Sequence, residues 1–286
     1  MKCSSFVAFG LVLVAGSIMT FGLTGCGSSV AQTEAALAPG TNDESKAKPS
    51  ETVALPGKGM AAIKQAADAG KYLFIFFSKA DDEQTLAMRK VYDKAMVKMV
   101  DRAQSVAVNV TDASEKALVD KFDLSRSPMP LVLAMAPNGA ITGGFPTKFE
   151  EQQLIDAMAS LGTTKVVKQL QEGKLVFVCV QNDKTKSNDV AMQGVRDFKA
   201  DARFASTTEI VTLDPTDKKE ATLLADLKVP VDTAEAITAF IVPPGQAIGK
   251  FEGATSKDAL VALLSKASTG GCGPGSCGPG GCGPKK

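Results

Sequence analysis

The chain has 286 residues, of which 44% are apolar and 22% charged, a composition typical of globular proteins and a length sufficient for two domains. Its 32 basic and 31 acidic side chains leave a net charge of +1, so the basic surplus that nucleic-acid binding requires is missing. The sequence contains no His, which removes the usual general base and the commonest metal ligand and so excludes most hydrolase mechanisms.

The first 25 residues have the pattern of a targeting segment rather than of a folded domain. Lys2 precedes an apolar stretch from Phe6 to Phe21, and small residues lead into Cys26. This pattern resembles the signal of bacterial lipoproteins, which implies that residues 1–25, including Cys3, are removed and that Cys26 carries the lipid. The alternatives are a plain secretory signal and a short membrane helix, although the stretch is short for a membrane span and rich in Gly and Ser.

Residues 26–56 are predicted to form a flexible tether, because they are polar, rich in Ala, Ser and Pro, and without a helical apolar stripe. Acyl chains such as palmitate on Cys26 would anchor the tether in a membrane, since each buried methylene contributes about 0.8 kcal/mol. The folded part would then lie outside the cytoplasm, in the periplasm or at the outer membrane or cell surface.

The remainder of the chain contains an internal repeat with a period of about 105 residues. Each copy has a short amphipathic helix, a Gly-Lys pair and an apolar strand, with the pairs at 70–71 and 173–174. Each copy also has two strands joined at a Pro-X-Gly turn, in which the glycines are Gly139 and Gly245. The repeat predicts two copies of one domain, over residues 57–162 and 163–267.

The order of elements is clearest in the first copy. The pattern predicts helix 58–70, strand 71–78, helix 83–100, strand 105–111, helix 113–122, a strand within 127–136 that opens a hairpin turned at 137–139, and helix 149–161. Continuous apolar strands that are joined by helices predict an α/β sheet with a parallel core, to which the hairpin adds an antiparallel edge.

This order, with the residues that carry it, resembles thioredoxin. The resemblance rests on KYLFIFFS (71–78), on the segment from VAVNVTDASEKALVDKF through SPMPLVLAMAPNGAITGGF (106–145), and on Pro130. It implies two tandem thioredoxin-like domains, each with a central mixed sheet flanked by helices. It also implies that Pro130 is the cis-proline before the third core strand, where active relatives hold an extended peptide against the redox site. In the second copy Ala236 stands at this position.

The resemblance places the two redox cysteines of thioredoxin at positions that hold no cysteine here. The first copy has Asp82 and Thr85 at these positions, and the second has Thr185 and Asn188. Because disulfide exchange needs two thiols, both loops are expected to be redox-inactive.

Two other groups of side chains in this part of the chain could carry chemistry. Asp81, Asp82 and Glu83 could form an acidic catalytic or metal-binding group, or they could cap the helix that follows, which is the simpler interpretation. Cys179 lies within the apolar stretch VFVCV and is expected to be a buried core residue.

Residues 268–286 form a Gly/Pro-rich tail that contains Cys272, Cys277 and Cys282. Three thiolates suit a soft metal ion such as Cu(I), because zinc normally takes four ligands. Alternatively, two of the three could form a disulfide outside the cytoplasm. A third alternative is a disordered low-complexity repeat without chemistry.

These observations predict a membrane-anchored lipoprotein whose thioredoxin-like domains bind a protein or peptide client, or serve as a scaffold, without catalysis. The alternative is a thiol-disulfide relay or a Cu(I)-handling protein that acts through the cysteine tail. No cofactor other than this possible soft metal ion is expected.

Overall fold

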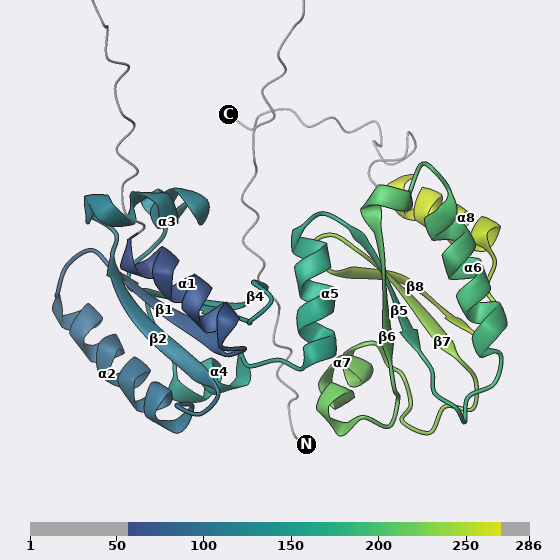
Figure 1. Cartoon of the computed structure of the whole chain (residues 1–286), viewed down its shortest axis with the longest axis horizontal. Coiled ribbons are helices and arrows are strands. Elements are labelled where there is room, and N and C mark those ends of the chain that lie inside the picture. Colours follow the sequence, from purple (N-terminus) through teal and green to yellow (C-terminus); the bar gives the residue numbers. More distant parts are fainter. Residues whose placement is uncertain (1–56, 270–286) are drawn as a thin grey trace, which may run out of the picture. The chain divides into compact units, whose positions relative to one another are not determined.

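The structure is a computed structural model that describes residues 57–269 (Figure 1). Cys26 and the rest of the predicted signal segment and tether, as well as the three cysteines of the tail, lie outside these residues. No helix within residues 57–269 is long and apolar enough to span a bilayer.

The described residues fold into two successive α/β domains with the same order of elements. The first domain contains α1 (Lys58–Asp68), β1 (Tyr72–Ser78), α2 (Glu83–Lys98), β2 (Ala103–Asn109), η1 (Ala113–Glu115), α3 (Lys116–Lys121), η2 (Leu124–Arg126), β3 (Leu131–Met135), β4 (Ile141–Pro146) and α4 (Glu151–Asp156). The second contains α5 (Leu161–Gln171), β5 (Leu175–Val180), α6 (Asn188–Ala200), η3 (Ala205–Thr207), β6 (Thr208–Leu213), η4 (Lys218–Glu220), α7 (Ala221–Asp226), β7 (Ile237–Val242), β8 (Gln246–Glu252) and α8 (Lys257–Thr269).

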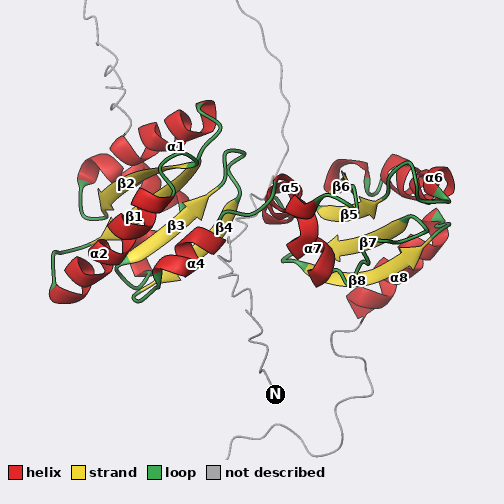
Figure 2. Cartoon of the chain, turned by 90° about the horizontal axis from the view of Figure 1, so that it is seen from below, coloured by secondary structure: helices red, strands yellow, loops and turns green. Residues whose placement is uncertain are grey.

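Each domain contains one mixed four-stranded sheet with helices on both faces (Figure 2). The strand orders are β2-β1-β3-β4 and β6-β5-β7-β8. The fold class predicted from the sequence, two α/β domains with mixed sheets, is therefore confirmed.

The predicted parallel core is wrong in one respect, since in each domain only the first two strands are parallel and the third runs antiparallel to the first. The connection from Asn109 to Leu131 contains η1, α3 and η2, and β3 begins at the end of the sheet where β2 finishes. A central strand that is covered on both faces has a continuous apolar sequence, which does not fix the direction in which the strand runs.

The unbroken apolar sequence of β1 follows from burial on both faces of the sheet. Phe74 and Phe76 pack under α2 and α4, on one face. Leu73, Ile75 and Phe77 pack on the other face, with side chains from α1 and α3. A central strand that is covered on both sides has no polar face, so its sequence does not alternate.

Strand β5 repeats this arrangement in the second domain. Val176, Val178 and Val180 pack with side chains from α5 and α7. Phe177 and Cys179 pack with side chains from α6 and α8 on the opposite face. The two sheets therefore have separate cores, as a repeated domain requires.

The predicted helix 149–161 is wrong in extent, because α4 ends at Asp156 and a new helix, α5, begins at Leu161. Ser160 is the N-cap of α5, and its side chain accepts a hydrogen bond from the backbone N–H of Thr163. This cap starts the second domain. The predicted boundary at 162–163 falls within the first turn of α5.

A buried glutamate binds the start of the first helix in each domain. Both carboxylate oxygens of Glu115 accept the backbone N–H of Gly59, at 3.1 and 3.2 Å. Glu220 accepts the backbone N–H of Gly162 at 2.8 Å. A Cβ at Gly59 would lie 2.9 Å from Glu115 and one at Gly162 2.6 Å from Glu220, so the approach requires glycine at both positions.

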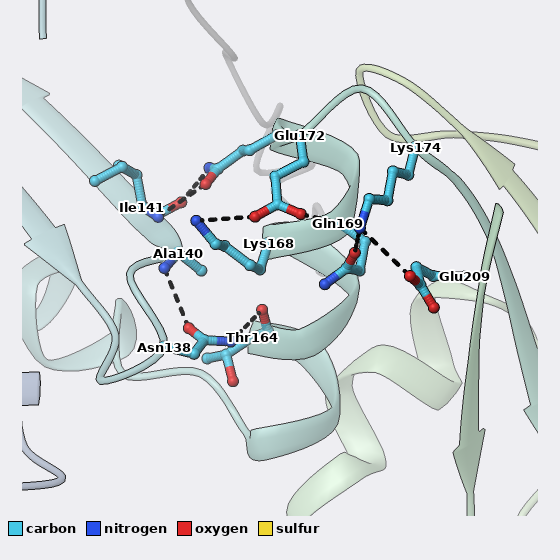
Figure 3. A network of polar contacts seen from close by, with 10 residues as sticks. Asn138, Ala140, Ile141, Thr164, Lys168, Gln169, Glu172, Lys174 and Glu209 are labelled. Carbon is cyan, nitrogen blue, oxygen red and sulfur yellow. Dashed lines mark hydrogen bonds and ion pairs between the residues drawn. The ribbon is translucent and has the colours of Figure 1, made fainter. Parts of the chain in front are cut away.

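Helix α5 contacts the β3–β4 hairpin of the first domain through side-chain amides (Figure 3). The Asn138 side chain donates to the backbone C=O of Thr164 at 3.0 Å. The Gln171 side chain accepts from the N–H of Ile141 at 3.0 Å and donates to its C=O at 2.8 Å. The Gln171 amide thus pairs with Ile141 as a neighbouring strand would.

Candidate functional site

The loop before α2 contains the first pair of positions that correspond to redox cysteines. Asp82 is the N-cap of α2, and its carboxylate accepts the backbone N–H of Thr85 at 2.7 Å. This hydrogen bond, with a second from the Thr85 hydroxyl, holds the pKa of Asp82 below its usual range. The carboxylate therefore stabilises the helix in the way the capping interpretation requires. Within residues 57–269, no group of three or more His, Cys, Asp or Glu side chains is placed to hold a metal ion.

The corresponding positions of the second domain also bond to each other. The Thr185 hydroxyl lies 2.7 Å from Asn188 Oδ1 and donates to it, while the Asn188 amide donates to the C=O of Asn182 at 2.8 Å. Each predicted pair is therefore brought together by the fold. The hydrogen bonds of each pair fix the conformation of its loop. Carboxyl, hydroxyl and amide groups cannot take part in disulfide exchange, which needs two thiols.

Pro130 lies directly before β3, and the Met129–Pro130 peptide bond is cis. Its C=O accepts the backbone N–H of Thr147 at 2.7 Å. The C=O of Thr147 in turn accepts the side-chain amide of Gln84, in the first turn of α2, at 3.0 Å. These bonds connect Pro130 to the Asp82 loop, so both lie at the same end of the first domain's sheet. We call the segment before the third strand, Met129 and Pro130 here, the client edge of the domain.

Met129 is the residue at this edge that the sequence analysis did not identify. Its backbone N–H and C=O have no hydrogen-bond partner among the described residues. The exposed side chain of Leu86, 51% accessible, lies in the first turn of α2. The position of Met129 next to the predicted cis-proline was the signal that could have identified it. The edge therefore offers a strand-like donor and acceptor, with an apolar side chain on the adjoining helix.

The second domain has a related edge with different residues. Ala236 occupies the position directly before β7, and its C=O accepts the backbone N–H of Gly253 at 2.7 Å, as Pro130 accepts that of Thr147. The strand order, the parallel and antiparallel pairs and the hydrogen bond accepted by the residue before the third strand thus agree between the domains. Each half is a thioredoxin-like domain.

The comparisons with known proteins agree with this fold and go no further. No family model and no curated protein matches the chain. Among solved structures, thioredoxin O2 from Arabidopsis thaliana is 15% identical with a TM-score of 0.30, over 35% of this chain and 83% of that chain. The first two thioredoxin domains of Saccharomyces cerevisiae Eps1p are 12% identical with a TM-score of 0.27, over 76% of this chain and 99% of that chain. Such low values carry no argument about function, and the strand order and register identify the fold.

Cys179 is the free cysteine among the described residues, and it is 2% exposed. Burial raises the pKa of its thiol to about 11, against a weaker opposing effect of a hydrogen bond with Thr238. The neutral thiol is therefore the stable form in the folded domain at physiological pH. Cys179 is a core residue, as the sequence predicts.

Cys179 also gives the second domain a defined dependence on pH. A thiol whose pKa is raised on folding stabilises the folded state fully below its unfolded pKa and less as the pH rises through the folded value. We expect the free energy of unfolding of the second domain to decrease in the wild type as the pH is raised from 9 to 11. In Cys179→Ala this decrease should be smaller, when the free energies of both proteins are measured by hydrogen exchange of β5 amides. Equal pH dependence in the two proteins would contradict the prediction.

Proposed function

We propose that the chain is a membrane-anchored extracytoplasmic lipoprotein whose first domain binds an extended segment of a client protein without thiol chemistry. The observation that carries the proposal is that the backbone N–H and C=O of Met129, beside Pro130, have no partner within residues 57–269. The sequence around Cys26 supports the anchor, and an acyl group on Cys26, detected by mass spectrometry of the native protein, is its test.

The binding mode follows from the groups that the edge presents. An extended segment would exchange two backbone hydrogen bonds with Met129, and these bonds are largely independent of client sequence. Each such bond contributes about 0.5–1.5 kcal/mol net, so backbone pairing alone gives weak binding. An apolar client side chain against Leu86 would add affinity. The expected client is therefore an unfolded or extended polypeptide with apolar side chains.

We expect Pro130→Ala to weaken binding of the full chain to reduced, carboxymethylated lactalbumin, an unfolded probe, by about tenfold or more, which is about 1.4 kcal/mol. Pro130 shapes the segment that presents Met129, so its loss disturbs both backbone groups. Binding is measured by fluorescence anisotropy of the labelled probe, and tyrosine fluorescence verifies the fold.

Val97→Ala is the matched control, because Val97 is an exposed apolar residue of the same domain near the end of α2. It should bind the probe as the wild type does. Absence of probe binding by the wild type, or equal binding by the folded Pro130→Ala protein, would refute the proposal.

The alternative function, a thiol relay or Cu(I) handling through the tail, has one supporting observation in the described residues. Because Cys179 is buried with a raised pKa, an accessible thiol of the proposed lipoprotein, in which Cys3 is removed and Cys26 is acylated, would come from Cys272, Cys277 or Cys282. An insulin-reduction assay and a Cu(I) titration with the wild type and with the triple Cys→Ser variant separate the two functions. Activity or stoichiometric Cu(I) that the triple variant lacks would favour the tail.

A further inference from the structure

We infer that the second domain closes its own client edge with a backbone bridge from its redox-loop position, so that each chain offers one client site, in the first domain. The bridge is a property of the fold by itself. The statement about clients rests on the proposed function.

The bridge joins Lys186 to the segment before β7. The backbone N–H of Lys186 donates to the C=O of Ala234 at 2.9 Å, and the N–H of Ala236 donates to the C=O of Lys186 at 2.9 Å. Lys186 and Glu235 form an isolated parallel β-bridge in this way. Lys186 thus bonds to the backbone on either side of Glu235, at the segment that corresponds to residues 128–130 of the first domain.

The remaining backbone acceptors of this segment are also occupied. The Thr233 hydroxyl donates to the C=O of Glu235 at 2.8 Å, and the N–H of Gly253 donates to the C=O of Ala236 at 2.7 Å. Glu235 corresponds to Met129 of the first domain. An extended client would therefore find the C=O of Glu235 already used and only its N–H without a partner, whereas Met129 has both groups unpaired in the described part of the chain.

The bridging loop is held in place by its own side chains. The Thr185 hydroxyl receives the backbone N–H of Asn182 at 2.9 Å, and the Asn182 amide donates to Asp214 at 2.9 Å. The hydrogen bond between Thr185 and Asn188 completes the set. The residues that replace the redox cysteines in this domain therefore fix the loop in the bridging conformation.

Two features of the sequence explain why the first domain cannot close in the same way. Pro130 has no N–H, so the donor that Ala236 supplies is missing. Helix α2 begins at Glu83, which is the counterpart of Lys186, whereas α6 begins only at Asn188. Lys186 therefore stays outside the helix with its backbone free for the bridge, while Glu83 is committed to the first helical turn.

Hydrogen exchange of the full chain tests the bridge without any client. We expect the amides of Lys186 and Ala236 to exchange at least about tenfold more slowly than that of Met129, after correction for intrinsic rates. Exchange of all three at the same corrected rate would overturn the inference. If the probe binds nowhere on the wild type, the proposed function fails, while these rates still decide whether the edge is closed.

A double variant, Thr233→Val with Ala236→Pro, tests the consequence for binding. It removes the hydroxyl and the N–H that close the edge, and the Lys186 amide should lose its protection. The number of carboxymethylated lactalbumin molecules bound per chain should rise from one to two. Thr207→Val is the control, since its hydroxyl bonds within an exposed turn of the same domain. If the variant binds one probe per chain although its Lys186 amide is unprotected, the proposal that the bridge prevents client binding to the second domain is refuted.

Discussion

Replacement of Glu115 by Ala is expected to lower the free energy of unfolding of the first domain by about 2–4 kcal/mol. The Glu115 side chain is 1% exposed, and both of its oxygens accept the N–H of Gly59 at the start of α1. The substitution leaves this buried N–H without its partner and creates a cavity, and both effects destabilise the folded state. The loss should be large because the bond fixes α1 to η1, fifty-six residues along the chain.

Tyrosine fluorescence during urea unfolding measures this change in the first domain alone. Tyr72 and Tyr92 are the two tyrosines of the chain, and the sequence has no Trp. Asp120→Ala is the control, because Asp120 forms an exposed ion pair with Lys116 whose loss should cost less than about 1 kcal/mol. Equal stability of Glu115→Ala and Asp120→Ala would show that the buried bond contributes nothing.

Gly194→Ala should destabilise the second domain by about 1–3 kcal/mol, although Gly-to-Ala in a helix normally stabilises by about 1 kcal/mol. A Cβ at Gly194 would lie 2.0 Å from the backbone oxygen of Thr255. Real contacts are never this close, so α6 or the segment before α8 must move. Because the clashing atom belongs to the backbone, overpacking outweighs the gain in helix propensity.

The reaction of Cys179 with a thiol reagent measures this effect when the three tail cysteines are replaced by Ser. The thiol is buried in the core that α6 covers, so its reaction rate reports opening of the second domain. Gln193→Ala on the exposed side of the same helix is the control and should change the rate little. A rate in Gly194→Ala equal to or below that of the wild type would contradict the predicted clash.

The two domains differ in whether the backbone before the third strand is already hydrogen-bonded, and few residues account for the difference. Pro130 in the first domain and Ala236 in the second stand at the same position, and both accept a backbone N–H from the loop after the hairpin. The difference is the donor that only Ala236 has, together with the later start of α6. Neither loop contains a cysteine at the positions that correspond to redox cysteines, and the two copies differ in the backbone hydrogen bonds of the segment before the third strand.

Several features could be predicted because they depend on local sequence. The apolar stretches of β1 and β5, the Gly-Lys pairs before them and the hairpin turns repeat along the chain, and repetition predicts two copies of one fold. The absence of cysteine at Asp82 and Thr85 is likewise visible in the sequence. The position of Pro130 before an apolar strand marked the edge of the site.

The features that escaped prediction depend on contacts between distant residues. In the sequence Glu115 and Glu220 look like ordinary charged residues near short helices. Nothing nearby indicates that each is buried and accepts the backbone N–H of a glycine fifty-six or more residues earlier. The antiparallel direction of β3 is set by its pairing with β1, which the apolar sequence of β3 does not reveal.

The sequence by itself therefore determined the class of fold, its duplication and the absence of cysteine from both loops, since side-chain type and spacing carry that information. Only the tertiary structure decided which of the two edges is open. Which edge is open depends on the backbone hydrogen bonds of Lys186 with Ala234 and Ala236. Every residue except proline carries the same backbone N–H and C=O, so only the fold decides which of these groups lie within hydrogen-bond distance.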